Sequence, residues 1–463
     1  MISVDALPDD VLIAIFDQYV NGDVQVSLNI GKEWQSLVHV CRRWRSIVFG
    51  SPRHLKLQLF CTVRTRARDM LDVWPALPLA IWCDRTGGVD NIIAALERRE
   101  RVCQIALMNV QSLDSGIYLE ALQQQFPELT TLFLHSVAEK VPVVPDSFLG
   151  GSAPRLEFLE LEGIPFPGLP KLLLSATHLV NLLLDIPHSG YISPQTMVTC
   201  LYSLTSLSSF SLGFASPRSC PDQASRRPPS STRSVLSVLT FFDFKGVTEY
   251  LEDLVAHIDA PRLNKLHITF VNDTVFDTQQ LMQFISRTPM SREFKKAHIT
   301  LWDDVASLDV SSQTSGDQEV LVKILCRGLE WQVSSLEQVC TSCLPPLSML
   351  ETVYIYNHPY SQPYWKDDIE NGLWLQLLHS FAAVKNLYLS EQFARRIGPA
   401  LQELTEGRTT EVLPALQKIF LEGLESLGPV QEGIAKFVAA RQVASRTIEV
   451  SSWANSDRDK RQH

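Results

Sequence analysis

The chain has 463 residues, more than one hydrophobic core usually supports, so it must hold several domains or a repeat array. Hydrophobic residues make up 45% of the chain and charged residues 20%, which excludes wholesale disorder. The net charge of −10 argues against a protein that holds nucleic acid by general basic attraction.

The chain shows no targeting or membrane signal. Its first ten residues lack a basic segment followed by an apolar stretch, as a secretory signal would have. The most apolar stretch, Val73–Cys83, contains two prolines and is too short to span a bilayer. Nine scattered cysteines indicate reduced thiols. We therefore expect a soluble protein of the cytoplasm or nucleus, with no membrane and no nucleic-acid partner.

Two amphipathic helices are predicted within residues 1–52. Pro8 suits the first position of a helix, and Asp9 and Asp10 place negative charge at its N-terminus. The apolar side chains that share a face at helical spacing are Val11, Leu12, Ile15, Phe16, Tyr19 and Val20. A second helix is predicted from about Trp34 to Phe49. Its apolar face holds Leu37, Val40, Cys41, Trp44, Ile47 and Val48, and Arg42, Arg43 and Arg45 lie largely opposite.

Two short helices cannot enclose so many large apolar side chains by themselves. An apolar face left over in a soluble protein usually marks a partner site, so we expect another protein to cover it. A dimer, or docking on the rest of the same chain, would satisfy the same need.

Residues 53–95 are expected to form a connector with the first helices, and a repeat follows from residue 96 to about 450. Each copy has an apolar residue, two others, an apolar residue, any residue, and an apolar residue. The copies begin at Val102, Leu129, Leu156, Leu179, Leu207, Leu239, Leu263, Phe294, Leu350, Val384 and Leu416, with a degraded one near Leu321 and Ile324. The steps between copies are all 23–34 residues, a spacing typical of stacked structural repeats.

The pattern predicts a strand at each L-x-L, followed by a helix or an irregular arm. Predicted helices are Val247–Ile258, Thr278–Ser286 and Leu373–Phe381. The pattern resembles an irregular leucine-rich repeat, although the asparagine expected after the third apolar position is absent from most copies. The fold class is therefore α/β: a small all-α domain followed by an irregular β/α solenoid, or horseshoe. Ordinary α/β domains with leucine-rich strands are the alternative.

Side chains between and beside the L-x-L positions should face out of the concave sheet. They are Phe133, Glu160, His267, His298, Tyr354, Tyr356, Tyr388 and Phe420. Aromatic anchors carry much of the energy of protein recognition, so we expect these aromatic and histidine side chains to contact a target protein. Alternatively, adjoining loops cover some of these side chains. A polar, proline-rich segment predicts an exposed loop at residues 216–234, and polar segments predict another at residues 311–319 and a flexible tail at residues 451–463.

The first fifty residues resemble the F-box motif. The matching segments are Leu7-Pro8-Asp9-Asp10-Val11-Leu12, Ile15-Phe16, Val40-Cys41-Arg42-Arg43-Trp44-Arg45 and Ser51-Pro52. The link Gly22–Gln35 is longer than is usual in that motif. The segments DVWPALPLAIW, IPFPGLPKLLLSATHLVNLLL and IPHSGYISP also resemble an expanded group of fungal F-box proteins with repeat-like C-terminal regions.

This resemblance implies a substrate receptor of a Skp–cullin–F-box ubiquitin ligase. Its F-box would bind a Skp-type adaptor and, through it, a cullin, while the repeats would hold a target protein. By position in the motif, the adaptor contacts or their immediate support would be Leu7, Pro8, Val11, Leu12, Ile15, Phe16, Val40 and Trp44. Packing of the two helices against each other is the alternative role for each.

Catalytic motifs are missing from the sequence. Gly428–Gly433 has the glycine spacing of a phosphate loop, but Ile434 stands where lysine is needed. Cys340 and Cys343 form a lone C-x-x-C, with His358 the nearest further zinc ligand, so we expect two reduced thiols and no metal. The acidic pairs Asp303-Asp304 and Asp367-Asp368 are expected to be solvated loop carboxylates.

We therefore expect a receptor that recruits a target for ubiquitin ligation, without catalysis or a cofactor of its own. A non-degradative interaction scaffold built on the same two domains is the main alternative. A hydrolase with unrecognised catalytic loop residues is a third.

Overall fold

The computed structural model describes most of the chain. The described residues are 7–21, 35–50, 56–74, 76–83, 88–109, 112–137, 141–214, 233–271, 278–292, 294–312, 318–344, 347, 349–357, 369–404, 408, 410–423, 428–444 and 446–453. They form two compact units, Met1–Leu207 and Ser208–His463, and each is taken by itself below. Among the described helices, none combines the length and the hydrophobicity that a bilayer crossing requires.

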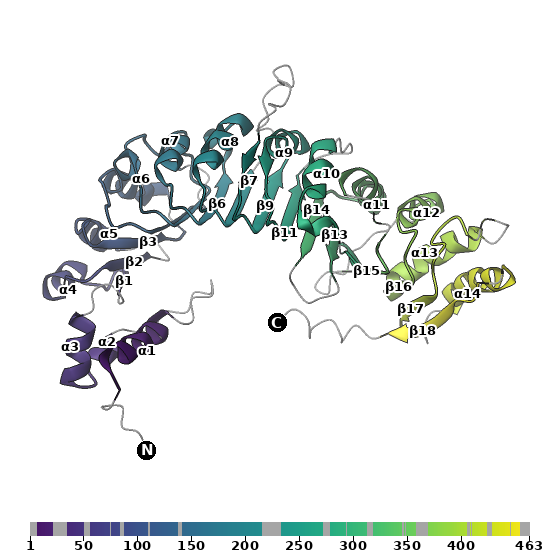
Figure 1. The fold of residues 1–463 in the computed structure, drawn as a ribbon, viewed down its shortest axis with the longest axis horizontal. Coiled ribbons are helices and arrows are strands. Elements are labelled where there is room, and N and C mark those ends of the chain that lie inside the picture. Colours follow the sequence, from purple (N-terminus) through teal and green to yellow (C-terminus); the bar gives the residue numbers. More distant parts are fainter. Residues whose placement is uncertain are drawn as a thin grey trace. The chain divides into compact units, whose positions relative to one another are not determined.

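The first unit opens with three helices, α1 (Asp9–Asn21), α2 (Gln35–Val38) and α3 (Arg42–Gly50) (Figure 1). The prediction of a single helix from Trp34 to Phe49 was wrong, because a turn at residues 39–41 divides it. The turn leaves the carbonyl of Val38 without a helical partner, and Nε of Arg45 donates a hydrogen bond to it at 3.0 Å.

A parallel sheet follows, with its strands neighbouring one another in chain order. They are β1 (Leu57–Phe60), β2 (Leu79–Cys83), β3 (Val102–Leu107), β4 (Thr131–His135), β5 (Phe158–Glu162) and β6 (Asn181–Ile186). The helices between and after them are α4 (Ala67–Val73), α5 (Val89–Leu96), α6 (Ser112–Ala121), α7 (Leu169–Ser175) and α8 (Pro194–Ser203).

The sheet begins earlier than the leucine pattern predicted. Residues 53–95, expected to be a connector with helices, contain β1 and β2 as well as α4 and part of α5. Leu57 and Leu59 are buried and lie in register with Leu79 and Ile81. The same alternation of buried and outward side chains therefore extends the sheet by two strands before the first copy of the pattern.

The second unit contains a larger sheet. In spatial order its strands are β7 (Ser209–Phe214), β9 (Phe241–Gly246), β11 (Lys265–Phe270), β14 (Glu319–Leu325), β13 (Val305–Ser311), β12 (Lys296–Leu301), β15 (Thr352–Asn357), β16 (Asn386–Leu389), β17 (Lys418–Glu422) and β18 (Glu449–Trp453). Two short strands, β8 (Ser234–Val235) and β10 (Ile258–Asp259), pair separately. The helices are α9 (Thr248–Val255), α10 (Gln279–Ser286), α11 (Leu329–Gln338), α12 (Asn371–His379), α13 (Glu391–Glu403) and α14 (Gly428–Val443).

Strands β12, β13 and β14 break the simple order of repeats. The chain passes from β11 to β12 across two strand positions, then returns through antiparallel β13 to β14, which pairs in parallel with β11. The repeat pattern predicts the Phe294 copy as the next strand in line and does not predict β13. It also predicts Leu321 as an inward position, whereas Val320, Val322 and Ile324 are the buried side chains of β14.

In each unit the helices cover one face of the sheet (Figure 1). The leucine-pattern positions fill the core between sheet and helices; Leu132, Leu159 and Leu182 are fully buried in the first unit, and Leu266, Val353 and Leu387 in the second. The α/β class and the strands expected at the L-x-L positions are confirmed. Ser451–Trp453 of the expected tail belong to β18, and residues 454–463 lie outside the described residues. Most of the expected loop at residues 216–234 lies outside the described residues.

Candidate protein-binding surfaces

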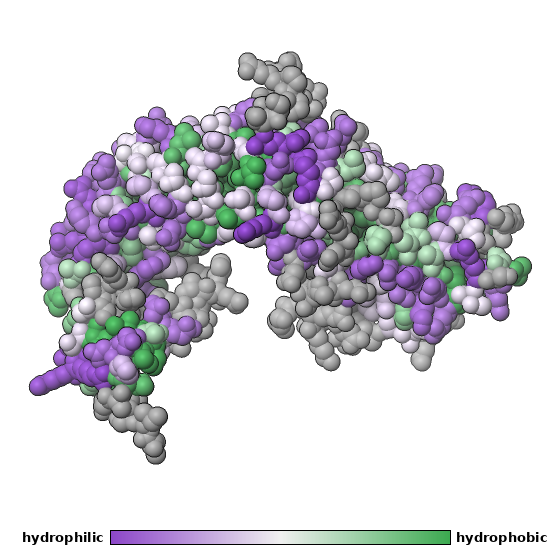
Figure 2. All heavy atoms as spheres, in the orientation of Figure 1, coloured by the Kyte–Doolittle hydropathy of each residue, from purple (hydrophilic) through white to green (hydrophobic). Residues whose placement is uncertain are grey.

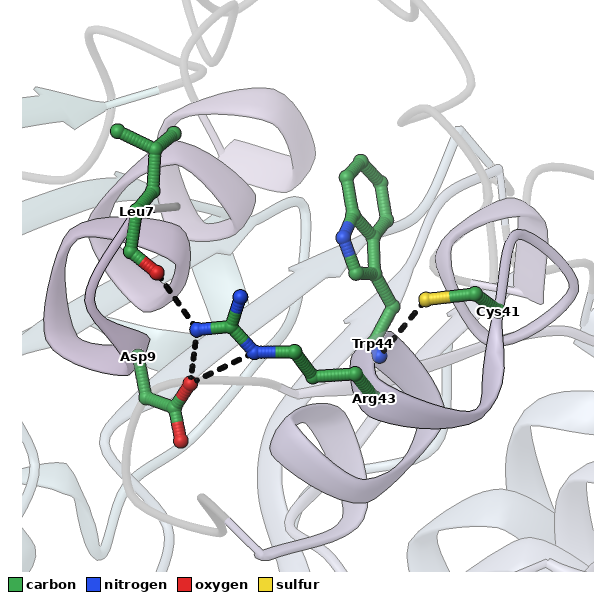
Figure 3. Close-up of polar contacts among 5 residues, drawn as sticks. All are labelled: Leu7, Asp9, Cys41, Arg43 and Trp44. Carbon is green, nitrogen blue, oxygen red and sulfur yellow. Dashed lines mark hydrogen bonds and ion pairs between the residues drawn. The ribbon is translucent and has the colours of Figure 1, made fainter. Parts of the chain in front are cut away.

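The N-terminal helices are joined by one aromatic and one polar contact. The rings of Phe16 and Trp44 lie with their centroids 4.6 Å apart, and Phe16 is fully buried. On the polar side, Arg43 donates from Nη2 to the carbonyl of Leu7 at 2.6 Å (Figure 3). The same guanidinium donates to Oδ1 of Asp9 from Nη2 at 2.6 Å and from Nε at 3.1 Å. Arg43 therefore ties α3 to the start of α1.

This role of Arg43 was not predicted, because helical spacing places the three arginines together on the solvent face of one long helix. The useful signal was the acidic N-terminus of α1, where Asp9 offers a carboxylate that a planar guanidinium can grip with two donors. Cys41 also acts locally, since its Sγ accepts a hydrogen bond from the backbone N–H of Trp44 at 3.4 Å.

The structure divides the apolar residues of α1 into two stripes. Leu12 and Phe16 point into the three-helix cluster and are 1% and 0% exposed. Val11, Ile15 and Tyr19 form the other stripe at four-residue spacing and are 39%, 47% and 37% exposed. Figure 2 shows apolar atoms gathered over these N-terminal helices.

Further apolar side chains of the three-helix cluster are exposed, notably Val40 at 59% and Phe49 at 40%. Leu7 and Trp44 are half-buried, and Pro8 is exposed. Of the eight residues predicted to contact or support an adaptor, the structure thus places Val11, Ile15, Val40 and Pro8 outward and Leu12 and Phe16 inward. The N-terminal helices expose an apolar stripe that they do not cover themselves.

On the face of the second sheet that the described helices do not cover, paired side chains form one continuous row. Across β7 to β18 the row reads Ser211, Asp243, His267, Leu321, Asp309, His298, Tyr354, Tyr388, Phe420 and Ser451. The sequence pattern predicted the outward position of five of them: His267, His298, Tyr354, Tyr388 and Phe420. All five are half-buried.

The aromatic half of this row is a stack of rings. Successive centroids from His298 through Tyr354 and Tyr388 to Phe420 are 4.4, 4.3 and 4.2 Å apart. Trp453 of β18 meets Tyr354 and Tyr388 edge-on and donates its indole N–H to the carbonyl of Leu389 at 3.1 Å. Rings stacked at this spacing bury one another's faces and leave mainly their edges to a partner.

Tyr356 differs from the other predicted contacts, because only 9% of it is exposed. Its hydroxyl lies 3.2 Å from Nδ1 of His298, and the two rings meet edge to face. Tyr356 therefore supports His298 from the next row of the sheet and offers little surface to a target.

A charged cluster lies beside the aromatic stack. Nε2 of His267 is 3.5 Å from Oε1 of Glu319, and contact with this imidazole is the main reason that the pKa of Glu319 is lowered. Burial, helped by the nearby charge of Glu319, raises the pKa of Asp309 to about 7, although His267 acts in the opposite direction. Oδ1 of Asp309 is buried without a hydrogen-bond partner.

The first sheet likewise has a face that the described helices do not cover. Phe133 of β4 stacks on Phe158 of β5 with centroids 4.4 Å apart, and Trp82 of β2 lies 6.4 Å from Phe133. Phe133 pairs in register with Glu160, and Glu160 with Leu183 of β6. Phe133 and Glu160 thus face outward, as the pattern predicted, and both are half-buried.

The two cysteines of the C-x-x-C segment lie in a short π-helical turn, Val339–Cys343, and are buried. Sγ of Cys343 accepts a hydrogen bond from Oγ1 of Thr278 at 3.1 Å. Burial raises the pKa of both thiols, that of Cys343 to about 12. His358 lies outside the described residues, and within the described part of the chain no three His, Cys, Asp or Glu side chains are arranged to hold a metal ion.

The remaining candidate polar residues are not gathered into a site. Asp303 and Asp304 are exposed at the turn between β12 and β13. Asp367 and Asp368 lie outside the described residues, and the Gly428–Gly433 segment opens α14.

No family model matches the chain, and no curated protein matches it. Among solved structures, the crystal structure of the TLR13–ssRNA13 complex is similar at 14% identity and a TM-score of 0.32, over 78% of this chain and 45% of that one. The leucine-rich repeat-containing protein LegL7 from Legionella pneumophila is similar at 11% identity and a TM-score of 0.27, over 83% of this chain and 97% of that one. The chain spans less than half the length of the TLR13 chain that it matches. At these identities and TM-scores, neither likeness bears on what the chain binds.

Proposed function

We propose that the protein is a substrate receptor of a Skp–cullin–F-box ubiquitin ligase. Its three N-terminal helices dock on a Skp-type adaptor, and the uncovered faces of its two sheets hold a target protein. The chain itself performs no chemistry; it brings the target to the ubiquitin-carrying enzyme and so raises its effective concentration there.

The exposed stripe of α1 is the observation that carries this proposal. Val11, Ile15 and Tyr19 lie along one side of α1, while Leu12 and Phe16 already fill the interior. The stripe occurs in the segment whose sequence resembles the F-box motif, where an adaptor would bind. Burying it removes apolar surface from water, which is the dominant favourable term in protein association.

The contact of Arg43 with Leu7 and Asp9 supports the same proposal. It joins the Leu-Pro-Asp-Asp segment to the Val-Cys-Arg-Arg-Trp segment, the two parts of the sequence on which the resemblance rests. Because the two helices are held together by this contact and by the Phe16–Trp44 pair, the apolar stripe is presented on a preorganised surface.

The test measures binding of the purified chain to a Skp-type adaptor. In the variant V11D/I15D, two exposed apolar side chains become charged while the interior residues stay unchanged. We expect binding to weaken by at least about tenfold, because burying one such side chain contributes ~1.5–3 kcal/mol. Unchanged adaptor binding by this variant contradicts the proposal.

Val73→Asp provides the matched control. Val73 ends α4 in the same unit and is 84% exposed, so the substitution makes the same chemical change away from the N-terminal helices. We expect it to leave adaptor binding unchanged. A receptor is distinguished from a non-degradative scaffold by a target whose ubiquitylation depends on this chain; adaptor binding without any such target favours the scaffold.

A further inference from the structure

One corner of the first sheet combines aromatic side chains with a cluster of carboxylates. Three adjacent strands present a grid of nine side chains on its uncovered face: Thr131, Phe133 and His135 of β4; Phe158, Glu160 and Glu162 of β5; and Asn181, Leu183 and Asp185 of β6. We call this grid the β4–β6 face. It belongs wholly to the first unit.

Three carboxylates crowd one side of the β4–β6 face. Glu162 lies in register with Asp185, and Glu160 is two residues before Glu162 on the same strand. Strands are ~4.8 Å apart and same-face neighbours within a strand are ~6.6 Å apart, so the three groups lie close enough to repel one another. The pKa of Glu160 is raised, first by burial and next by the charge of Glu162.

Within the residues that the structure describes, little positive charge opposes these carboxylates. His135 is within ion-pair distance of one of them, with its Nε2 3.6 Å from Oε2 of Glu162. Neither Glu160 nor Asp185 forms an ion pair with any residue in the described part of the chain. Oδ1 of Asp185 is buried there without a hydrogen-bond partner. On β17 and β18 of the second unit, by contrast, Glu449 is paired with Lys418 at 2.8 Å.

Aromatic rings border the carboxylates directly. Phe133 lies beside Glu160 in register, stacks on Phe158, and continues toward Trp82. A guanidinium is planar and weakly hydrated, so it can lie against an aromatic ring while its N–H groups reach a carboxylate. A neutral or acidic segment would gain only the aromatic part of this surface and would leave the carboxylates desolvated and unpaired.

We propose that the β4–β6 face binds an extended basic segment of a target protein, with an arginine or lysine side chain seated between Phe133 and the carboxylates of Glu160, Glu162 and Asp185. This inference rests on the proposed function and gives the target a chemical class. The uncovered face of the second sheet lacks this excess of negative charge. Its carboxylates lie among Lys245 of β9, Lys265 of β11 and Lys323 of β14.

The first step of the test selects binders from a library of random short peptides on the immobilised full chain. We expect arginine and lysine to be enriched over the input library, and the enrichment to be lost on the variant E160Q/D185N. Selected peptides without basic residues, or the same enrichment on the variant, overturn the proposal.

The second step measures the affinity of one selected peptide and of the same peptide with citrulline in place of arginine, which keeps the shape and removes the charge. Partly exposed ion pairs each account for up to about fivefold in affinity, so we expect the citrulline peptide, and the E160Q/D185N variant, to bind about tenfold more weakly. Equal affinities overturn the proposal.

The matched control, D303N/D304N, removes two exposed carboxylates at the β12–β13 turn of the second unit. We expect it to bind the peptide as the unaltered chain does; an equal loss would make the effect one of net charge and would overturn the proposal. Adaptor binding is measured separately on the same variants. Failure of peptide binding with intact adaptor binding rejects this inference alone, and the converse rejects the proposed function alone.

Discussion

The ring of Trp44 lies against the ring of Phe16 with the two planes tilted by 56°, and this pair joins α3 to the buried side of α1. The neighbouring residue Ile15 points to the other side of the helix and is 47% exposed. Two adjacent residues of one apolar segment therefore have separate tasks, one in the interior of the helical cluster and one at its surface.

Phe16→Ala should destabilise the N-terminal helices by about 3–5 kcal/mol, because it empties a fully buried site. Ile15→Ala should change their stability by less than ~1 kcal/mol, since half of the side chain is already in water. Hydrogen exchange of the α1 amides measures the local opening free energy of each variant. Equal effects of the two substitutions would contradict the orientation of α1.

Arg43→Gln should loosen the start of α1 by about 1 kcal/mol, the usual net value of a partly exposed charged hydrogen bond. The substitution removes the donors to Asp9 and to the carbonyl of Leu7. Faster amide exchange in the first turn of α1 is the expected signal. Arg42→Gln is the control, because Arg42 is adjacent and exposed; a similar change in that variant would show that the guanidinium contacts of Arg43 are unimportant.

Asp309 makes the stability of the second unit depend on pH. Its pKa is about 7 in the folded chain and near 4 when unfolded, so below about pH 4 it is protonated in both states and contributes nothing. As the pH rises from about 4 to 7, the unfolded chain loses a proton that the folded chain retains, and stability falls by roughly 2–4 kcal/mol.

The asparagine in the variant Asp309→Asn cannot ionise, so this variant should not lose stability through this site as the pH rises. Denaturant titrations of the variant and the unaltered chain should therefore agree near pH 4 and diverge with rising pH, the variant being more stable at pH 8. Asp304→Asn, at an exposed turn, should follow the unaltered chain throughout. A variant that is less stable at every pH would show that the carboxyl of Asp309 serves a structural need instead.

The shielded thiols should be unreactive in the folded protein. Burial raises the pKa of Cys61 and Cys343 to about 12 and that of Cys200 and Cys326 to about 11, so almost no thiolate is present near pH 7. Alkylation followed by mass spectrometry should modify these four cysteines in denaturant and spare them in the native chain. Rapid native labelling of Cys343 would indicate that its segment opens.

The leucine pattern predicted strands well, because buried and outward positions of a strand differ in residue type. Leu159 and Leu161 are apolar and face inward, whereas Glu160 between them is charged and faces outward. The pattern could not predict the order of β12, β13 and β14, since pairing between strands depends on partners far apart in the chain. In β13, buried Ala306, Leu308 and Val310 alternate with Ser307 and Asp309, so the strand has an ordinary pattern of its own. It lies between two copies of the repeat and pairs antiparallel with both of its neighbours, and the spacing of the repeat does not predict such a strand.

The candidate surfaces were predicted in part for similar reasons. Helical spacing placed Val11, Leu12, Ile15 and Phe16 on one broad apolar face, but only packing against Trp44 decides which of them turn inward. The carboxylates of β5 and β6 are ordinary surface residues in the sequence. Register alone brings Glu162 beside Asp185 across 22 intervening residues.

The out-of-order pairing of β12, β13 and β14 affects how the second unit folds during synthesis. During synthesis β11 emerges before its neighbour β14, and the intervening chain must first turn back on itself twice before that neighbour exists. Until about Leu325 has left the ribosome, the backbone of Lys265–Phe270 keeps one row of hydrogen-bonding groups unpaired, as a sheet edge open to wrong partners. This stretch therefore cannot assemble one repeat at a time; residues 296–325 must arrive and close as a single block.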